Sequence, residues 1–104
     1  MKDASLKARP KRKERILKQA AAGTSVLLKL DGGQYFALNE VGGRIWDLCD
    51  GRHTVSEIIA ILSSEYDMPA ETIEHDLGEL LTNLANENLV DQNTQKIDDT
   101  PAAG

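Results

Sequence analysis

The spacing of hydrophobic residues changes once along the chain, near residue 38. Before this point, short apolar runs over residues 16–20, 25–30 and 34–38 are separated by polar or glycine-containing segments. After it, apolar residues recur every three or four positions, as they do on one face of an α-helix. The pattern therefore predicts three strands followed by helices.

The second and third runs are joined by Asp31-Gly32-Gly33, residues that tolerate the positive φ of a tight hairpin. We therefore expect a three-stranded antiparallel sheet. In the third run, alternation places Tyr35 and Ala37 on one face and Phe36 and Leu38 on the other. The alternation does not say which pair faces the core.

Three helices are predicted after the strands, each with its own start signal. Asn39 is a suitable N-cap for the first, Thr54 and Glu57 form an S/T-x-x-E capping box for the second, and Pro69 suits the first position of the third. We expect the second helix to end near Tyr66 and the third near Asn88. The expected apolar faces comprise Val41, Ile45, Leu48 and Cys49, then Val55, Ile58, Ile59 and Leu62, then Ile73, Leu77, Leu80, Leu81 and Leu84.

The predicted fold class is α+β: a winged-helix-like βββααα domain in which three short helices cover one face of a small sheet. The chain has 104 residues, enough for one domain. We place that domain at residues 15–90. Residues 1–14 lack hydrophobic periodicity and are interpreted as a disordered basic arm, and residues 91–104 as a disordered polar tail.

The net charge of −5 is unevenly distributed. Residues 1–18 carry eight Lys and Arg against two acidic residues, whereas the remaining positions carry four against fifteen. A lone cysteine, Cys49, excludes an internal disulfide, and no apolar run is long enough to span a membrane. These features favour an acidic cytoplasmic domain that neither is exported nor crosses a membrane.

No residue pattern indicates catalysis, and we predict that the chain is not an enzyme. Cys49 falls on an apolar helix face, where a thiol usually packs. His53 and His75 are interpreted as surface residues, so no metal site is expected. The sequence contains no phosphate-binding glycine loop followed by Lys and Ser or Thr, and no cofactor is expected. Three carboxylates of the third helix are interpreted as a solvated face: Asp76, Glu79 and Glu87.

The winged-helix-like order also raises the possibility of a regulatory protein that binds nucleic acid. A helix in the major groove needs Lys or Arg for phosphate contacts. From Pro69 to Asn88 the chain has five acidic residues and no Lys or Arg. We therefore expect no specific nucleic-acid binding, and leave only the basic arm as an alternative route to it.

A series of short motifs runs from Tyr35 to Val90. In chain order they are Tyr35-Phe36-Ala37-Leu38-Asn39, Gly43-Arg44-Ile45-Trp46-Asp47-Leu48, Asp50-Gly51, Thr54-Val55, Asp76-Leu77, Leu80-Leu81, Leu84 and Asn88-Leu89-Val90. This order of motifs resembles the family of pyrroloquinoline quinone (PQQ) biosynthesis protein D, PqqD, the prototype of peptide-recognition elements in the biosynthesis of ribosomally synthesised and post-translationally modified peptides (RiPPs). The chain has Asn88-Leu89 where members often have Gly-Leu.

This resemblance implies a chaperone that captures the leader of a precursor peptide. The leader pairs with the edge of the third strand and lies against the third helix, and a radical S-adenosylmethionine (SAM) enzyme is the usual second partner. From the resemblance we expect PQQ biosynthesis or a related pathway, and a monomer or weak dimer. A structural subunit of an enzyme complex remains an alternative.

From the resemblance and the strand pattern we select candidate peptide-binding residues on the third strand and the third helix. Gly78 and Ala85 either form a shallow strip for a guest backbone or merely fit neighbouring helices. The candidates are Gln34, Tyr35, Phe36, Ala37, Leu38, Asp76, Leu77, Gly78, Leu80, Leu81, Asn83, Leu84 and Glu87.

Overall fold

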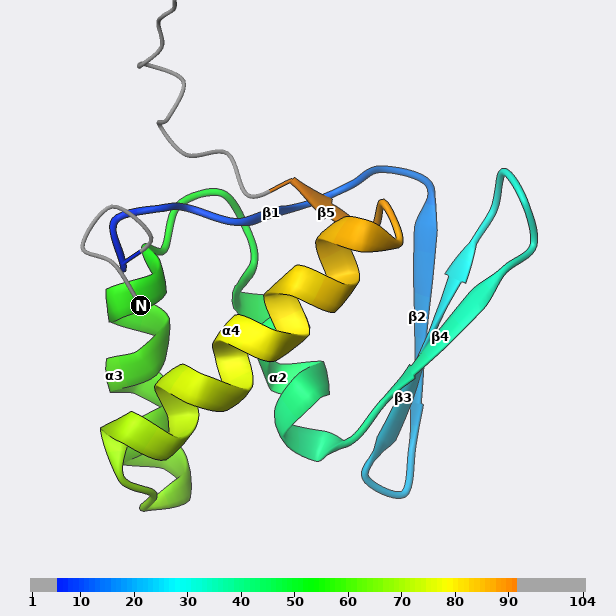
Figure 1. Cartoon of the computed structure of the whole chain (residues 1–104). Coiled ribbons are helices and arrows are strands. Elements are labelled where there is room, and N and C mark those ends of the chain that lie inside the picture. The colour runs from blue at the N-terminus through cyan, green and yellow to red at the C-terminus, as the bar shows by residue number, and fades with distance from the viewer. Residues whose placement is uncertain (1–5, 92–104) are drawn as a thin grey trace, which may run out of the picture.

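The computed structural model of the protein describes residues 6–91. A three-stranded sheet stands beside three helices, and a short two-stranded ribbon closes one end of the domain (Figure 1). In chain order the elements are β1 (Lys11–Arg12), β2 (Ile16–Ala21), β3 (Thr24–Lys29), β4 (Tyr35–Leu38), α2 (Glu40–Leu48), α3 (Val55–Tyr66), α4 (Ala70–Asn86) and β5 (Val90–Asp91).

The antiparallel sheet has the order β2-β3-β4, which confirms the three predicted strands. Its turns use residues with positive φ. Ala22 (φ 52°) and Gly23 (φ 82°) form the two-residue turn between β2 and β3, and Gly33 (φ 77°) lies in the predicted turn between β3 and β4. A two-residue turn with positive φ at both positions suits the right-handed twist of β2 and β3, and the sheet can form from consecutive hairpins.

The three predicted helices are confirmed, together with most of their end signals. The Asn39 side chain accepts a hydrogen bond from the Gly42 N–H, and Thr54 and Glu57 form the reciprocal capping box at the start of α3. Pro69 is the N-cap of α4 rather than its first helical residue. Local sequence signals thus set the helix boundaries to within about two residues.

The end of α4 shows how this chain does without the Gly-Leu pair. Asn88 has a φ of 60°, and the Leu89 N–H donates to the Leu84 carbonyl at 2.8 Å. Asparagine is one of the few residues with a side chain that enter this left-handed conformation readily. Asn88 therefore ends the helix as a glycine would, and Leu89 turns into the core, where it is 1% exposed.

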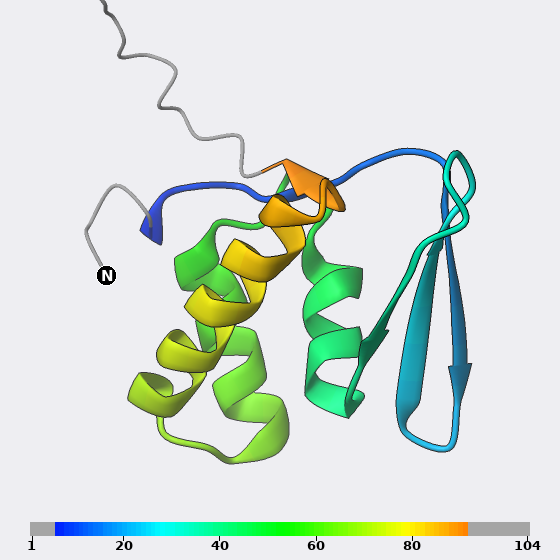
Figure 2. The same cartoon turned by 45° about the vertical axis from the view of Figure 1, so that its right-hand side comes forward.

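Helix α2 lies close to the sheet because its first turn contains glycines. A Cβ atom on Gly43 would lie 2.7 Å from Ser25 Oγ of β3, closer than real Cβ contacts allow. The same glycine lowers the intrinsic helix propensity of this turn. Here close packing of helix and strand outweighs local propensity, and Figure 2 shows α2 between α4 and the sheet.

The hydrophobic core lies among the helices and the inner face of the sheet. The predicted stripe of α4 is confirmed at four of its five positions, whereas Leu80 is only partly buried. None of the helices within residues 6–91 has the length and apolar character needed to cross a bilayer. The core side chains contributed by the helices include Ile45, Trp46, Leu48, Cys49, Val55, Ile58, Ile59, Leu62, Ile73, Leu77, Leu81 and Leu84.

Residues 6–14 differ from the expected separate arm, because they pack along the domain. Strand β1 pairs with β5, and Ala8 is 2% exposed. The Val55 N–H donates to the Ala8 carbonyl, and the Arg12 guanidinium donates to the carbonyls of Trp46 and Asp47. The prediction of a disordered arm is therefore wrong for this segment; residues 1–5 of the expected arm, and residues 92–104 of the expected tail, lie outside the described residues.

Candidate functional site

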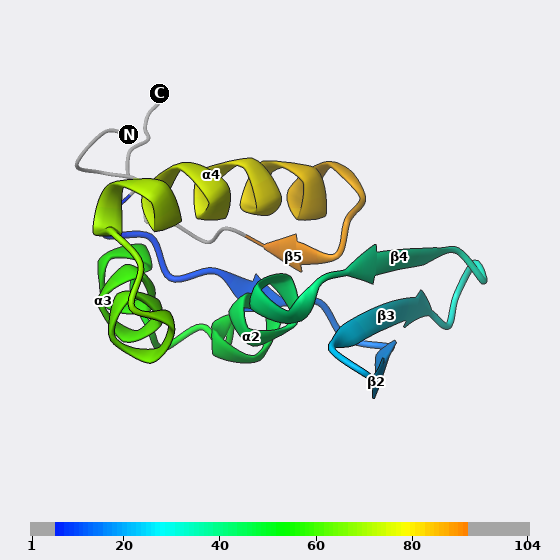
Figure 3. The ribbon, with the colours of Figure 1, turned by 90° about the horizontal axis from the view of Figure 1, so that it is seen from below.

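A groove of about 610 Å³ separates β4 from α4. Seen from below in Figure 3, β4 is the strand of the sheet nearest α4, and β2 is the farthest. The groove has an apolar floor and a polar rim. It is lined by Phe36, Ala37, Leu38, Asn39, Val41, Gly42, Ile45, Met68, Ile73, Asp76, Glu79, Leu80 and Asn83.

The structure decides which face of β4 looks inward. Leu38 is buried and Phe36 half-buried, whereas Ala37 is exposed and Tyr35 is 75% exposed. Phe36 and Leu38 therefore contribute to the inner face beside the groove. Tyr35 and Ala37 alternate with them and lie on the outer face, although Ala37 also borders the groove at the edge of the strand.

Strand β4 has a free edge, because no strand among residues 6–91 pairs with its far side. The Lys29 N–H donates to the Gln34 carbonyl at 2.8 Å, which makes this residue pair a hydrogen-bonded one in the ladder. Antiparallel ladders alternate bonded and non-bonded pairs, so Phe36 and Leu38 also bond to β3. The N–H and C=O groups of Tyr35 and Ala37 consequently face outward, and the free edge offers four main-chain groups.

The candidate residues of α4 divide into three sets. Asp76, Leu80 and Asn83 line the groove. Gly78 lies instead in a shallow depression on the exposed side of the helix, and Glu87 is exposed beyond the groove lining. The remaining three are at most 1% exposed, so they support the groove from beneath without reaching its surface: Leu77, Leu81 and Leu84.

Two further candidates also lie away from the groove. Gln34 is exposed just before β4, and its carbonyl is already bonded to β3. Ala85 packs against the hydrophobic core, which agrees with the interpretation of this small residue as a fit to its neighbours.

Sequence reasoning missed about half of the groove lining. Val41, Ile45 and Ile73 were assigned to the core from their helical spacing, and they do pack there while also forming the groove floor. Helical spacing cannot tell a core position from one at the margin of a groove. Glu79 could have been found, because it lies three residues after Asp76 and hence on a neighbouring part of the helix surface.

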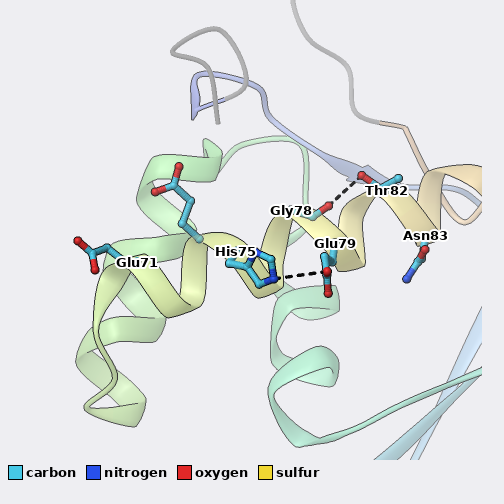
Figure 4. Close-up of a pocket in the computed structure, with 7 residues that line it drawn as sticks. Glu71, His75, Gly78, Glu79, Thr82 and Asn83 are labelled. Carbon is cyan, nitrogen blue, oxygen red and sulfur yellow. Dashed lines mark hydrogen bonds and ion pairs between the residues drawn. The ribbon is translucent and has the colours of Figure 1, made fainter.

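The charge of the groove is negative. Asp76 and Glu79 are the charged residues of its lining, and both side chains come from α4. Glu79 also borders the exposed depression, where its Oε2 lies 3.4 Å from His75 Nε2. Figure 4 shows Glu79 and Asn83 on the side of α4 that faces α2 and the sheet, whereas Glu71 projects from the start of the helix.

The described residues hold no arrangement suited to covalent or metal chemistry. Cys49 is fully buried, and its desolvation raises the pKa of the thiol to about 12, so a reactive thiolate is disfavoured. His53 is paired with Asp50 at 3.0 Å. No group of three His, Cys, Asp or Glu side chains within residues 6–91 could hold a metal ion. The groove lining itself consists of apolar residues, two amides and two carboxylates.

Comparisons with known proteins agree with this fold. A search of curated proteins found no match. Among solved structures, TbiB1 in complex with the TbiA(beta) leader peptide is 34% identical, with a TM-score of 0.70 over 80% of this chain and 96% of that one. Lasso peptide synthetase B1, complexed with its leader peptide, is 24% identical and shares the fold, with a TM-score of 0.69 over 80% of this chain and 98% of that one.

The family comparison covers most of the domain. The model of coenzyme PQQ synthesis protein D matches residues 24–90, from the start of β3 to the first residue of β5. This range contains both walls of the groove. With its family match over more than half of its length, and its likeness to TbiB1, the chain belongs to the PqqD family.

Proposed function

We propose that this protein binds the leader segment of a ribosomally synthesised precursor peptide by adding it as a further strand to β4. The observation that carries the proposal is the free edge of β4 beside an apolar groove. Strand addition needs unpaired main-chain groups on an edge and pockets for alternate side chains of the guest. Tyr35 and Ala37 provide the former, and the groove beside Phe36 and Leu38 provides the latter.

The family relationship supports the same function. TbiB1 and lasso peptide synthetase B1 were both solved with leader peptides. The first of them is 34% identical to this chain, and the matched region includes both β4 and α4. A leader peptide is therefore the class of guest that the relatives favour.

The energetics assign different roles to the edge and the groove. Four main-chain hydrogen bonds worth about 1 kcal/mol each supply about 4 kcal/mol. Micromolar binding needs about 8 kcal/mol, in addition to the cost of ordering the peptide. The difference corresponds to burying at least about 160 Å² of apolar surface at about 25 cal/mol per Å². The ladder thus orients the guest, and groove contacts supply the remaining affinity and the specificity.

We further propose that the bound leader is presented to a separate modifying enzyme, with a radical SAM enzyme as the first candidate, and that this chain is not itself a catalyst. The buried thiol and the binding character of the groove support this division of labour. Nucleic-acid binding is not favoured, because α4 has four acidic residues and no Lys or Arg, so that its charge opposes contact with phosphates.

The proposal is tested by titrating isotope-labelled protein with a synthetic precursor leader peptide. We expect the largest amide shifts at residues 34–38 and 76–87, with a dissociation constant of about 1 μM or below. A scrambled peptide of the same composition is the control. Shifts confined to residues 6–14, or equal shifts with the scrambled peptide, would contradict the proposed site.

A further inference from the structure

The groove is negative on one wall and has no cationic group to balance it. Of its thirteen lining residues, Asp76 and Glu79 alone are charged. Asp76 is exposed, and within residues 6–91 it forms no hydrogen bond or ion pair. The neighbour of Glu79 is His75, and this pair is ionic only when the imidazole is protonated. Both carboxylates are therefore available to a bound ligand.

Basic side chains that could neutralise this wall are engaged at other places in the domain. Lys18 pairs with Asp47 at 2.9 Å, and the guanidinium of Arg44 pairs with Glu65 at 2.8 Å. Lys29 Nζ donates to the Glu87 carbonyl beyond the groove lining. The negative wall consequently remains uncompensated by the described part of the chain.

We infer that the groove selects guest segments in which a lysine or arginine follows or precedes an apolar anchor by two residues. This inference rests on the proposed function and adds the chemistry of the accepted guest. Side chains two residues apart in a strand point to the same side, so both would enter the groove. The apolar side chain packs on the floor, and the cationic one reaches Asp76 and Glu79 on the α4 wall.

The dimensions of the two walls agree with this pairing. Two residues of a strand advance by about 6.6 Å. The helical rise from Asp76 to Leu80 is about 6 Å. Lysine and arginine also carry long aliphatic stems, which can cover an apolar surface while the charged end reaches a polar rim. The stem of a cationic side chain can therefore pack on the apolar floor beside Leu80, while its charged end pairs with the carboxylates of Asp76 and Glu79.

A random peptide library tests this preference independently of any particular leader sequence. Peptides of 12 residues displayed on phage are selected on three proteins: wild type, Asp76→Asn with Glu79→Gln, and Glu71→Gln with Glu74→Gln. The two double variants remove the same charge at the same i, i+3 spacing on the same helix. The control pair lies in the exposed depression and outside the groove lining.

We expect peptides selected on the wild type to be enriched in Lys or Arg two positions from an apolar residue. When such peptides are synthesised, the groove variant should weaken their binding about tenfold and the control variant less than about twofold. Raising the salt concentration should reduce the affinity of the wild type more than that of the groove variant. Thermal melting checks that both double variants are folded. If the groove double variant does not fold, the single substitution Glu79→Gln is used in its place.

The outcomes separate this inference from the proposed function. Selected peptides that shift the amides of residues 34–38, yet lack basic residues and bind both double variants equally, would overturn the inference and leave strand addition intact. Equal weakening by the two double variants would also overturn it, because overall charge would then be responsible. Failure to select any peptide that reaches β4 would count against the proposed function itself.

Discussion

At the residue scale, Asp50 organises the connection between α2 and α3. Its Oδ1 accepts hydrogen bonds from the backbone N–H groups of Arg52 at 2.8 Å and His53 at 3.1 Å, and the His53 ring lies 3.0 Å away. Desolvation is the largest single influence and raises the pKa of this carboxyl, but together these hydrogen bonds outweigh it and lower the pKa to about 2. The ionised carboxylate is thus the form that the fold prefers.

This preference predicts how the contribution of Asp50 depends on pH. A carboxyl with a pKa of about 2 in the folded state and about 3.9 in the unfolded state stabilises the fold above pH 4, and that contribution is lost as the pH falls toward 2. Asp50→Ala should lower the free energy of unfolding by about 1 to 2 kcal/mol at pH 7. Urea titrations of the two proteins should give converging values between pH 4 and pH 2.

Asp50→Asn serves as the control for this experiment, since it retains an acceptor but cannot ionise. The loss of unfolding free energy in Asp50→Asn, relative to the wild type, should be smaller at pH 7 than that in Asp50→Ala. This loss should also decrease at low pH. A deficit of Asp50→Ala that stayed constant from pH 7 to pH 2 would show that the charge of this residue contributes nothing.

At the element scale, α4 and β4 each divide their residues between the core and the groove. Leu77 and Leu80 belong to the same apolar stripe of α4, yet Leu77 is 0% exposed and Leu80 is partly exposed in the groove. In β4 the division concerns the backbone, because alternate residues bond to β3 or face the free edge. Neighbouring positions of one element should therefore respond differently to the same substitution.

Leu80→Ala and Leu77→Ala form one such comparison. Truncating Leu77 leaves a cavity in the core and should cost about 2 to 5 kcal/mol of stability. Truncating Leu80 should cost about 1 kcal/mol of stability, but should weaken leader binding about tenfold through the loss of groove contacts. Denaturant unfolding and fluorescence anisotropy measure the two effects. Similar losses of stability in both variants would mean that Leu80 acts as a core residue.

Ala37→Pro tests the ladder directly. Proline removes the Ala37 N–H that faces the free edge, and proline is tolerated on edge strands where that group points to solvent. The variant should remain folded and lose at least about tenfold in leader affinity, because one hydrogen bond disappears and the ring occupies the position of the guest backbone.

The matched control is Ala20→Pro on the opposite edge of the sheet. Leu30 bonds to Arg15 in the same ladder, so the alternation leaves the N–H of Ala20 facing away from β3. Ala20→Pro should have a stability similar to that of Ala37→Pro, and its affinity for the leader should equal that of the wild type. Equal loss of affinity in the two variants would indicate general damage to the sheet and contradict strand addition at β4.

At the scale of the whole molecule, residues 6–14 hold separate parts of the domain together. The Gly51 N–H donates to the Pro10 carbonyl, the Arg12 N–H to the Cys49 carbonyl, and the Lys13 N–H to the Leu89 carbonyl. This segment thereby connects the end of α2 with the end of α4. It is part of the folded unit, although four of its nine residues are basic and exposed: Lys7, Arg9, Lys11 and Lys13.

A pair of neighbouring substitutions distinguishes this packed segment from a free arm. Ala8→Asp would place a charge at a site that is 2% exposed, and should lower the free energy of unfolding by more than about 2 kcal/mol. Lys7→Asp introduces the same side chain at an exposed position. It should change the free energy of unfolding by less than about 0.5 kcal/mol. Calorimetric melting temperatures that fell equally in both variants would argue against tight packing of Ala8.

The sequence alone predicted the types, the order and most of the boundaries of the three sheet strands and the three helices, but not the short ribbon of β1 and β5. These features depend on interactions between residues that are close in the chain: the hydrophobic period, the Asn39 cap, the Thr54 capping box and the glycines of the hairpin. The PqqD resemblance also came from the sequence, and it brought β4 and α4 into the candidate site. Of the α4 candidates selected on this basis, Asp76, Leu80 and Asn83 line the groove beside β4.

The tertiary structure alone decided which face of β4 is buried, which part of the α4 stripe leaves the core, and where residues 6–14 lie. Each depends on contacts between residues far apart in the chain, such as Ala8 with Val55 or Gly43 with Ser25. Residues from 36 to 83 surround the groove, and its volume and charge exist only when β4, α2 and α4 pack together. Periodicity identifies the apolar face of a helix or strand, but only tertiary packing determines whether that face contacts the core or lines the groove.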